Sequence, residues 1–361
     1  MKLVYLYRYI CVLALYSNFA LAGTYLESIP QNALANINGV IAICAGPDPS
    51  KCETSVSHYY GQLNEHSQFV IGSVTKQMLA VLILKEYEKG TLNLDSPIGR
   101  YLPELMNQPK SKATLHQLLN HTAGLSDKTL DLQFEPGTSY KYSNFAYELL
   151  GRIITSQTKL PLADHFSLLF SEAKMKNSGF LAEPVPIEKK KFPALSPGYM
   201  ELPLVPFSLC IPKQDPFRCP CPFPYIYPPS GGVVSTVHDL HFWNQALYRD
   251  KLLLSQNSLN LMTSKQVKIP IHRYGPSVHY GYGLMISNQD ELLEYSHTGY
   301  VWGYTASNLY YPTEDISVIV LENVSRGLLG MARDQKEAGF WSHDQIRKYI
   351  RSRILREVAD N

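Results

Sequence analysis

The order of secondary-structure patterns along the chain predicts an α/β (α+β) fold. Residues 37–72 alternate in the manner of two or three strands, with a turn at Gly46-Pro47. Residues 91–180 carry helical patterns and loops, and residues 280–325 alternate as strands again. Strands at both ends with helices between them indicate one α/β domain built from both chain ends, with a helical domain inserted.

These patterns also give approximate boundaries. We expect the α/β part to cover about residues 23–95 and 230–361, and the helical part about residues 96–229. Within the helical part, residues 184–229 are rich in proline and cysteine and poor in periodicity. Irregular segments of this length are usually functional or mobile. We therefore expect a long insertion whose position before the Ser-Gly-Gly sequence lets it wall or cover a cleft.

Two helices can be placed from their end signals. One helical pattern covers residues 73–89, and Gly90 stops it. A second helix is expected directly after Gly231, where Thr236 and Asp239 have the spacing of a capping box. The first of these helices is apolar over most of its length, so we expect it to be buried.

The bulk composition excludes several classes of function. The 361 residues are 45% hydrophobic and 18% charged, which is typical of a globular protein with one large domain or two. The net charge is only +2, so we expect no nucleic-acid partner. The basic amphipathic segment 342–358 is expected to pack on the sheet with a solvated charged face, in preference to lying on a membrane.

The N-terminus has the pattern of a targeting signal. Lys2 and Arg8 supply positive charge before an apolar core that is too short to span a bilayer comfortably. Ala20-Leu21-Ala22 then forms a small-x-small cleavage site. We predict that residues 1–22 are a signal peptide, that the mature chain covers residues 23–361, and that it is exported to the periplasm or secreted. The alternative is an uncleaved anchor; after cleavage no membrane span is expected.

Export would permit disulfide bonds. Cys44 ends a strand-like run and Cys52 follows a turn-rich stretch, so a hairpin would bring the two together. We therefore predict a Cys44–Cys52 disulfide. Cys210 could pair with Cys219 or Cys221, which would leave one free thiol. The alternative is that all of these cysteines are reduced and simply packed.

Ser73 and Lys76 are the first candidates for catalysis. Positions i and i+3 lie on the same face of a helix, so the hydroxyl and the amine can be within hydrogen-bond reach. A serine hydroxyl needs a base, and lysine can serve when burial lowers its pKa. The apolar run that follows supplies this burial, and the helix N-terminus offers the backbone N–H of Ser73 as half of an oxyanion hole. We predict that Lys76 activates Ser73.

The spacing alone is weak evidence, because two other pairs share it. Ser156–Lys159 and Ser171–Lys174 also have the pattern Ser-x-x-Lys. Ser73 differs in its context, which consists of an apolar approach, a preceding glycine and a buried helix behind it. This context is what favours Ser73.

Two further motifs could complete a site. Tyr142-Ser143-Asn144 stands before a helix, where Tyr142 could relay protons and Asn144 could hold Lys76 or a substrate amide. The alternative is a turn tyrosine with an asparagine helix cap. His297-Thr298-Gly299 lies on a predicted strand, and its glycine would let substrate approach the backbone. His279-Tyr280-Gly281 matches the same loose pattern, so this motif is also weak alone.

His238 and His241 are three residues apart on a predicted helix and could together hold a metal ion. The sequence offers no evident third ligand for them. Ordinary surface histidines are therefore the preferred interpretation, and no metal is predicted.

Taken together, the order Ser-x-x-Lys, Tyr-x-Asn and His-Thr-Gly resembles the serine β-lactamase and DD-peptidase superfamily, on its class C and DD-carboxypeptidase side. Supporting stretches cover about residues 37–325 apart from the insertion; they are "GTLNLDSPIGRYLPEL", "LLNHTAGLSD", "PGTSYKYSNFAYELLGRII", "SGGVVSTVHDL" and "SHTGYVWGYTAS". The resemblance implies a serine β-lactamase/transpeptidase-like fold, with an antiparallel sheet flanked by N- and C-terminal helices and a mainly helical domain beside it.

The resemblance also implies roles for individual residues. Ser73 would be the acyl-enzyme nucleophile, with Lys76 and Tyr142 as base and proton relay. Asn144 and the strand His297-Thr298-Gly299 would contact the substrate. The backbone N–H groups of Ser73 and Tyr300 would form the oxyanion hole. No metal or cofactor is implied.

His297 bears on the choice of substrate. Class C β-lactamases usually carry lysine at this position, and lysine holds a substrate carboxylate as a cation. An imidazole with a pKa near ~6.5 is mostly neutral at pH 7 and holds an anion less well. We therefore expect DD-carboxypeptidase-like or weak β-lactamase activity, on a D-Ala-D-Ala peptide or a β-lactam. The alternatives are a carboxylesterase or D-aminopeptidase on the same fold, and a penicillin-binding sensor or structural protein that does not hydrolyse.

Overall fold

The central sheet has eight antiparallel strands in the order β2-β1-β12-β11-β10-β9-β8-β7. Both ends of the chain contribute: its strands are β1 (Gly39–Ala45), β2 (Glu53–Ser57), β7 (Val267–Lys268), β8 (His279–Tyr280), β9 (Met285–Ser287), β10 (Glu294–Val301), β11 (Tyr304–Tyr311) and β12 (Ile316–Glu322). β1 lies directly beside β12, with Ile41 opposite Val320. The expected antiparallel sheet with strands from both chain ends is therefore confirmed.

This description rests on a computed structural model that covers residues 25–58, 61–182, 191–201, 228–270, 272, 274–326 and 341–359. The predicted signal peptide, most of the 184–229 insertion and the cysteines at 210, 219 and 221 lie outside these ranges. Among the helices of these ranges, none combines the length and the apolarity that a bilayer crossing requires.

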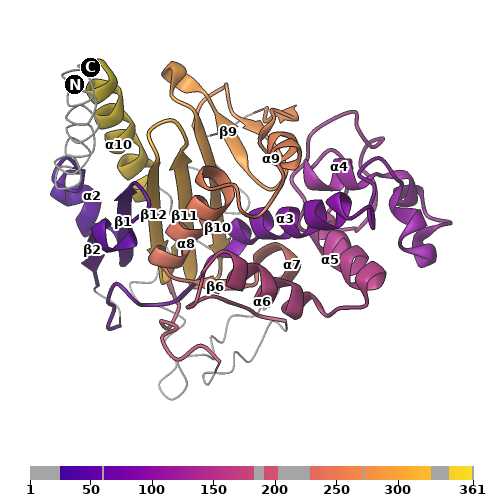
Figure 1. Cartoon of the computed structure of the whole chain (residues 1–361), viewed down its shortest axis with the longest axis horizontal. Helices are drawn as coiled ribbons and strands as arrows, with labels where there is room; N and C mark the ends of the chain where they lie inside the picture. Colours follow the sequence, from indigo (N-terminus) through magenta and orange to yellow (C-terminus); the bar gives the residue numbers. More distant parts are fainter. Residues whose placement is uncertain are drawn as a thin grey trace, which may run out of the picture.

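Helices cover both faces of the sheet (Figure 1). One face carries α2 (Gln31–Ala35) and the long C-terminal helix α10 (Trp341–Ala359). Ile346, Ile350 and Ile354 of α10 are at most 1% exposed and pack on the sheet. The expectation that α10 packs on the sheet is confirmed. Its charged face is not wholly solvated, however, because Arg347 and Arg351 are buried as well.

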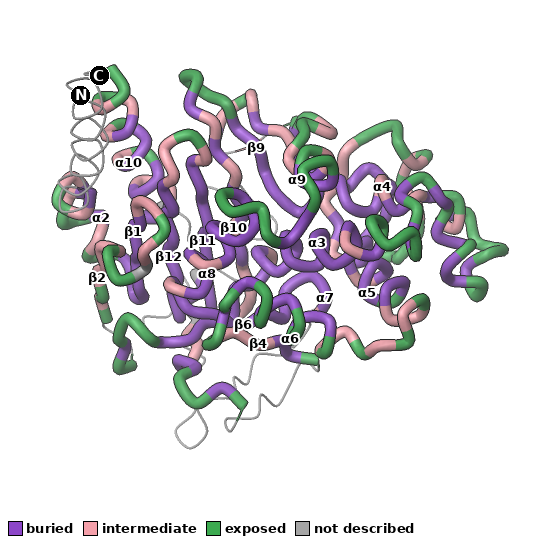
Figure 2. Tube along the Cα trace, in the orientation of Figure 1, coloured by how far each residue is buried: buried purple, intermediate pink, exposed green. Residues whose placement is uncertain are grey.

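The other face and the region beside it carry the remaining helices. These are α3 (Thr75–Glu88), α4 (Leu115–Leu119), α5 (Asn144–Thr158), α6 (Leu162–Glu172), α7 (Pro228–Gly231), α8 (Val237–Asn244) and α9 (Gln256–Thr263). Figure 2 shows that α3 is buried along nearly its whole length, because it lies between the sheet and the other helices. The predicted helix over residues 73–89 begins as a short 3₁₀ turn, Gly72–Val74, and continues as α3.

Short elements connect these layers. Two small sheets pair β3 (Phe69–Val70) and β4 (Gly179–Phe180) with β6 (Val233–Ser235), and β13 (Val324–Arg326) with β5 (Tyr199–Glu201). Further 3₁₀ turns are Pro49–Lys51, Ile98–Arg100, Pro103–Leu105, Pro109–Lys112 and Gln289–Glu291, and Gln245–Arg249 is a π-helical turn.

The prediction for the segment after Gly231 was only partly right. A strand, β6, intervenes before helix α8 begins at Val237. Thr236 caps α8 as expected, because its Oγ1 accepts from the Asp239 N–H at 3.1 Å. The Asp239 carboxylate does not complete a capping box; it accepts instead from the Asn177 N–H at 2.7 Å and the Ser178 hydroxyl at 2.7 Å. The tertiary contact therefore replaces the local one.

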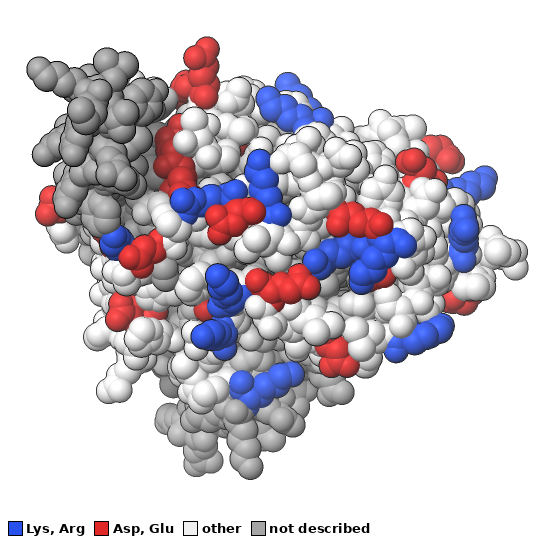
Figure 3. Space-filling model, in the orientation of Figure 1, with Lys and Arg blue, Asp and Glu red and all other residues white. Residues whose placement is uncertain are grey.

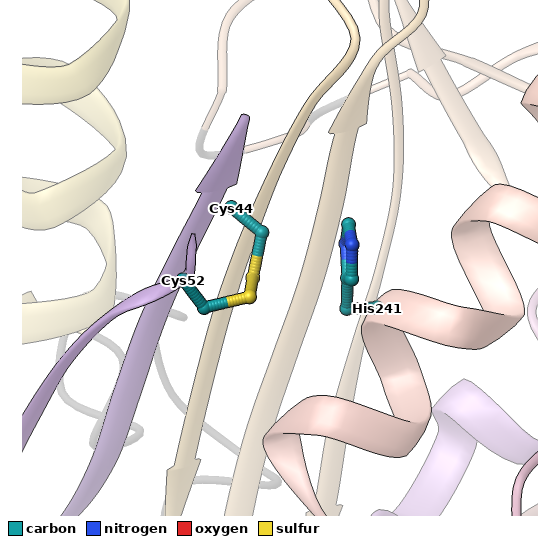
Figure 4. Close-up of side chains that lie close together, drawn as sticks. All are labelled: Cys44, Cys52 and His241. Atoms are coloured by element: carbon teal, nitrogen blue, oxygen red, sulfur yellow. A yellow bond between two sulfur atoms is a disulfide. The ribbon is translucent and has the colours of Figure 1, made fainter. Parts of the chain in front are cut away.

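The β1–β2 hairpin contains the disulfide that its spacing predicts. Cys44 and Cys52 are joined by a disulfide bond, with their Cα atoms 4.2 Å apart (Figure 4).

On the face drawn in Figure 3, cationic and anionic side chains are interspersed along the described surface. That view shows no broad block of one sign.

Candidate active site

Ser73 stands where the chain turns from β3 into the buried helix α3. The turn requires a glycine at position 72, because the φ angle of Gly72 is +52° and this left-handed backbone region favours glycine. Ser73 occupies a 3₁₀ turn, in which residues three apart align along the axis. Its side chain is half-buried, whereas the positions behind it on α3 are buried. The fold thus presents one hydroxyl at the surface of an apolar helix.

Lys76 is fully buried and directed at this hydroxyl. Its Nζ lies 3.0 Å from Ser73 Oγ, 2.8 Å from Asn144 Oδ1 and 2.9 Å from the Ser230 carbonyl oxygen. The two carbonyl oxygens can only accept, so they hold two hydrogens of the amine. A neutral amine has two hydrogens and one lone pair. With both hydrogens directed at the carbonyl oxygens, the lone pair faces Ser73. The arrangement is therefore suited to removing the serine proton.

The electrostatics of Lys76 favour the neutral amine. Burial holds the pKa of Lys76 well below its ordinary value of 10.5, since an ammonium loses hydration there. The charge of Asp127 acts in the opposite direction and raises this pKa. The three atoms in direct contact with Nζ belong to neutral groups. Burial therefore dominates, and Lys76 has the character of a base.

Asp127 is a residue of the site that the motif analysis missed. Its Oδ2 accepts from the backbone N–H and from Nδ2 of Asn144, at 3.0 and 3.1 Å. Its Oδ1 accepts from the Ser143 hydroxyl at 2.7 Å and from the Phe145 N–H at 3.0 Å. These contacts cap helix α5 and fix the Asn144 amide with its oxygen toward Lys76. Ser143, and not Asn144, is the N-cap residue of α5.

Tyr142 lies beside the same pair. Its ring centroid is 4.9 Å from Lys76 Nζ, and its side chain hydrogen-bonds Ser73. Burial raises the pKa of Tyr142, while the Ser73 contact opposes this rise. The phenol therefore stays protonated at neutral pH. With a neutral lysine, Ser73 donates to Lys76 and its oxygen can accept from Tyr142.

A buried histidine, which sequence reasoning also missed, supports this tyrosine. The His121 ring lies 4.3 Å from the Tyr142 ring and 4.7 Å from the Tyr280 ring, centroid to centroid. Its Nδ1 accepts from the Ser143 N–H at 3.3 Å. Burial, together with the charges of Lys76 and His297, holds the pKa of His121 well below 6.5. His121 is thus a neutral side chain that packs against Tyr142. The stretch "LLNHTAGLSD", which the resemblance had singled out, contains both His121 and Asp127.

Strand β10 crosses directly over the Ser73 turn. A Cβ atom on Gly299 would lie 1.9 Å from the Ile71 carbonyl oxygen and 3.1 Å from the Ser73 nitrogen. A Cβ atom on Gly72 would lie 2.8 Å from the Tyr300 nitrogen. The absence of side chains at both glycines therefore lets the backbone at Tyr300 approach the backbone at Ser73 closely. Thr298 is half-buried on the same strand.

His297 is also on β10, but its two ring nitrogens face protein groups. Nδ1 lies 2.7 Å from the Thr298 carbonyl oxygen, and Nε2 lies 2.8 Å from the Tyr280 hydroxyl. A carbonyl only accepts, so Nδ1 carries a proton, and a neutral ring then accepts from Tyr280 at Nε2. His297 is buried, with 3% of its surface exposed. It contacts the site through Tyr280 and the Tyr142 ring, 6.3 Å away.

The competing motifs lie elsewhere. Lys159, Ser171 and Lys174 are exposed, so the other Ser-x-x-Lys pairs lack the buried setting of Lys76. His238 and His241 are on α8, away from the residues described above. Tyr280, from the second His-x-Gly match, does enter the site through its contact with His297.

Comparison with known proteins identifies the family to which the chain is similar. A family model described as "Beta-lactamase" matches residues 51–338. The chain is 27% identical to the "Putative penicillin-binding protein PbpX" of Bacillus subtilis (strain 168), over 74% of this chain and 64% of that protein. It is 30% identical to "Esterase EstB" of Burkholderia gladioli, over 34% of this chain and 41% of that protein. The chain therefore spans less than two thirds of the length of these relatives.

Solved structures agree on the fold. The D-amino acid amidase from Ochrobactrum anthropi SV3, complexed with L-phenylalanine amide, has a TM-score of 0.72 at 23% identity, covering 92% of this chain and 99% of that chain. The penicillin binding protein from Bacillus halodurans has a TM-score of 0.67 at 23% identity, covering 85% and 95%. These likenesses confirm the predicted β-lactamase/transpeptidase-like fold. Because the family model matches most of its length, the chain belongs to the beta-lactamase family.

Proposed function

We propose that this chain is a serine hydrolase that acts through an acyl-enzyme on Ser73. The observation that carries the proposal is the fully buried Lys76 amine, 3.0 Å from Ser73 Oγ, with two of its hydrogens committed to carbonyl oxygens. General-base assistance of this kind contributes about 10²–10⁴-fold to a proton-transfer step.

The proposed reaction has two halves. Ser73 Oγ attacks the acyl carbon while its proton passes to Lys76, and the backbone N–H groups of Ser73 and Tyr300 hold the oxyanion. Tyr142 and Lys76 then return a proton to the leaving group. In the second half, water attacks the acyl-enzyme along the same proton path and releases Ser73. Asn144 is proposed to orient Lys76 and to contact the substrate, with Thr298 and Gly299 along the strand.

The first candidate substrates are a D-Ala-D-Ala peptide, as in a DD-carboxypeptidase, and a β-lactam hydrolysed weakly. Relatives described as penicillin-binding proteins support this choice. One observation favours a second candidate, an uncharged ester or amino-acid amide: both nitrogens of His297 face protein groups, so its ring is poorly placed to hold a substrate carboxylate. An esterase and a D-amino acid amidase among the similar proteins point the same way.

Export is part of the proposal. It rests on the charged and apolar pattern of residues 1–22 and on the Cys44–Cys52 disulfide, which an oxidising compartment would preserve. Periplasmic and secreted destinations are both compatible with that pattern.

The test is intact-mass spectrometry after exposure to a penicillin, a D-Ala-D-Ala peptide, a short ester and a D-amino acid amide. We expect a covalent adduct on Ser73 that decays as product appears. An adduct that forms on Ser73 and never decays would support the non-hydrolytic penicillin-binding alternative. An adduct mapped to Ser156 or Ser171, or no adduct with any compound, would contradict the assignment.

A further inference from the structure

A second cluster of reactive side chains, none of which belongs to the Ser73 site, lies between the β1–β2 hairpin and helix α8. The sulfurs of Cys44 and Cys52 and a ring nitrogen of His241 all lie within 4.8 Å of one another (Figure 4). Cys44 is the next-to-last residue of β1, Cys52 directly precedes β2, and His241 approaches from α8, which packs on the sheet. Three elements thus direct potential metal ligands to one point.

The His241 side chain shows an unused coordination site. It is fully buried, and its Nε2 makes no hydrogen bond of good geometry within the described part of the chain, although the Pro47 carbonyl lies near the ring. Nδ1 lies 3.2 Å from Ser317 Oγ, which also accepts from Asn244 Nδ2 at 3.1 Å. A ring held at one nitrogen with the other nitrogen free is the usual arrangement of a metal-binding histidine.

We propose that Cys44, Cys52 and His241 form a Zn²⁺ site when the disulfide is reduced. Two thiolates and one imidazole are a donor set that zinc accepts, with a fourth position open to water. Zn–S distances of about 2.3 Å in a tetrahedral site place the two sulfurs about 3.7 Å apart. Side-chain rotation of the two cysteines can reach this separation, because their Cα atoms are already 4.2 Å apart.

Two molecules of a thiol reductant cleave the disulfide, giving the Cys44 and Cys52 thiols and one molecule of oxidised reductant disulfide. Zinc then replaces one proton on each thiol and binds neutral Nε2 of His241. The site is thus present in the reduced chain and absent in the oxidised chain. In both states the hairpin is closed, by a covalent bond in one and by the metal in the other.

Access to the cluster comes through a neighbouring cavity. A cavity of about 420 Å³ is lined by Cys52 together with His66, His238, Asp239 and Glu65, among others. Cys52 is half-buried, whereas Cys44 is fully buried. A reductant or a hydrated cation can therefore reach the Cys52 sulfur first. The acidic and imidazole side chains of the cavity suit the entry of a divalent cation.

The test uses the full chain with the cysteines at 11, 210, 219 and 221 changed to serine, so that no other thiol binds metal. The protein is reduced with a phosphine, which is then removed under anaerobic conditions, and Co²⁺ is added as a spectroscopic probe. We expect one Co²⁺ per chain, with a thiolate-to-cobalt charge-transfer band that Zn²⁺ abolishes. The oxidised protein should show no such band.

Two variants separate the proposed site from chance thiol binding. His241→Ala should weaken Co²⁺ binding at least tenfold, whereas His279→Ala, on β8 and outside both the cluster and the cavity, should leave it unchanged. If His241→Ala fails to fold, the thermal midpoint of the reduced parent protein decides, because bound Zn²⁺ must raise it. No thiolate band in the reduced chain, equal affinity in folded His241→Ala, or a midpoint that Zn²⁺ leaves unchanged would overturn the proposal.

Discussion

Two buried cation sites lie on opposite faces of the same sheet and are built in opposite ways. On the α10 face, Arg347 Nε lies 3.0 and 2.9 Å from the two carboxylate oxygens of Glu294. Arg351 lies 3.5 Å from the same carboxylate, and the Tyr311 hydroxyl donates to it at 3.0 Å. On the α3 face, Lys76 contacts only neutral oxygens, and its nearest carboxylate, Asp127, reaches it through Asn144.

The difference appears in the proton affinity of each cation. Burial disfavours both charges and is the largest influence on Arg347, but Glu294, together with Tyr311 and Tyr274, outweighs it, and the pKa of Arg347 is raised. Lys76 has no such contact, and its pKa falls. A buried cation held by a carboxylate is a permanent structural charge, whereas one held by neutral acceptors can release its proton. The first arrangement fixes a helix on the sheet, and the second is suited to chemistry.

The largest expected effect is on Lys76. Lys76→Ala should lower the acylation rate constant of Ser73 by about 10²–10⁴-fold, because the proton acceptor is removed. The measurement is stopped-flow acylation with a chromogenic ester, together with circular dichroism. Lys85→Ala is the matched control, since Lys85 is on the same helix but pairs with Glu172 at 2.9 Å. A loss below tenfold in Lys76→Ala, with the fold intact, would make Lys76 a structural residue.

The next effect is on stability. Glu294→Gln should lower the free energy of unfolding by about 3–5 kcal/mol, because it leaves the buried Arg347 guanidinium without its carboxylate and removes one of the two carboxylates near Arg351. Urea denaturation measures this change. Glu104→Gln, at an exposed pair with Arg152, should cost less than about 1 kcal/mol. If the two variants were equally stable, the buried cluster would not be what fixes α10.

Asp127→Asn tests how much the one charged group near Lys76 affects its pKa. It removes the charge that raises the pKa of Lys76, so that pKa should fall further. Lys76 acts as a base when unprotonated, and the acid limb of the pH–rate profile should therefore move to lower pH. The rate at the plateau should fall about tenfold, because an amide cannot accept at every contact that orients Asn144. An unshifted acid limb would show that Asp127 acts on position alone.

The smallest effect concerns His297. The ratio of acylation rates for a penicillin and for a neutral ester should change less than about threefold between pH 5.5 and 8, because both ring nitrogens face protein groups. Rapid-quench kinetics on both substrates gives this ratio, in which the shared titration of Lys76 cancels. A tenfold rise of the ratio toward pH 6 would instead identify a protonated His297 that holds the carboxylate. His297→Lys should raise penicillin acylation in either case.

The sequence carried enough information to predict the layers of the fold and a buried Lys76 beside Ser73. Alternation over residues 280–325 predicted the strands, and the apolar run behind Ser73 predicted a buried Lys76. The 3₁₀ turn at Ser73 was not foreseen, but it places the side chains at i and i+3 together as a helix would. Local periodicity was therefore sufficient wherever a contact lies within one element.

Contacts between elements were beyond the reach of such patterns. Asp127 lies in a loop, and its role depends on where α5 begins relative to that loop. Asp239 left its expected capping box because Asn177 and Ser178 offered it donors from another segment. His241 was interpreted as a surface histidine, since nothing local shows that α8 would pack it against the hairpin disulfide. These three side chains acquired their partners only through tertiary structure.

The crossing of Gly72 and Gly299 has a consequence for how such a protein can diverge. Any β-carbon at Gly299 would collide with the backbone at Ile71, and one at Gly72 would crowd the Tyr300 nitrogen. Nearly every mutation at these codons is therefore expected to be lost. Heritable variation in substrate preference is expected instead in the surrounding rings, such as Tyr280 and His297. A lineage could thus exchange one acyl compound for another while the pair of backbone donors passes unchanged from ancestor to descendant.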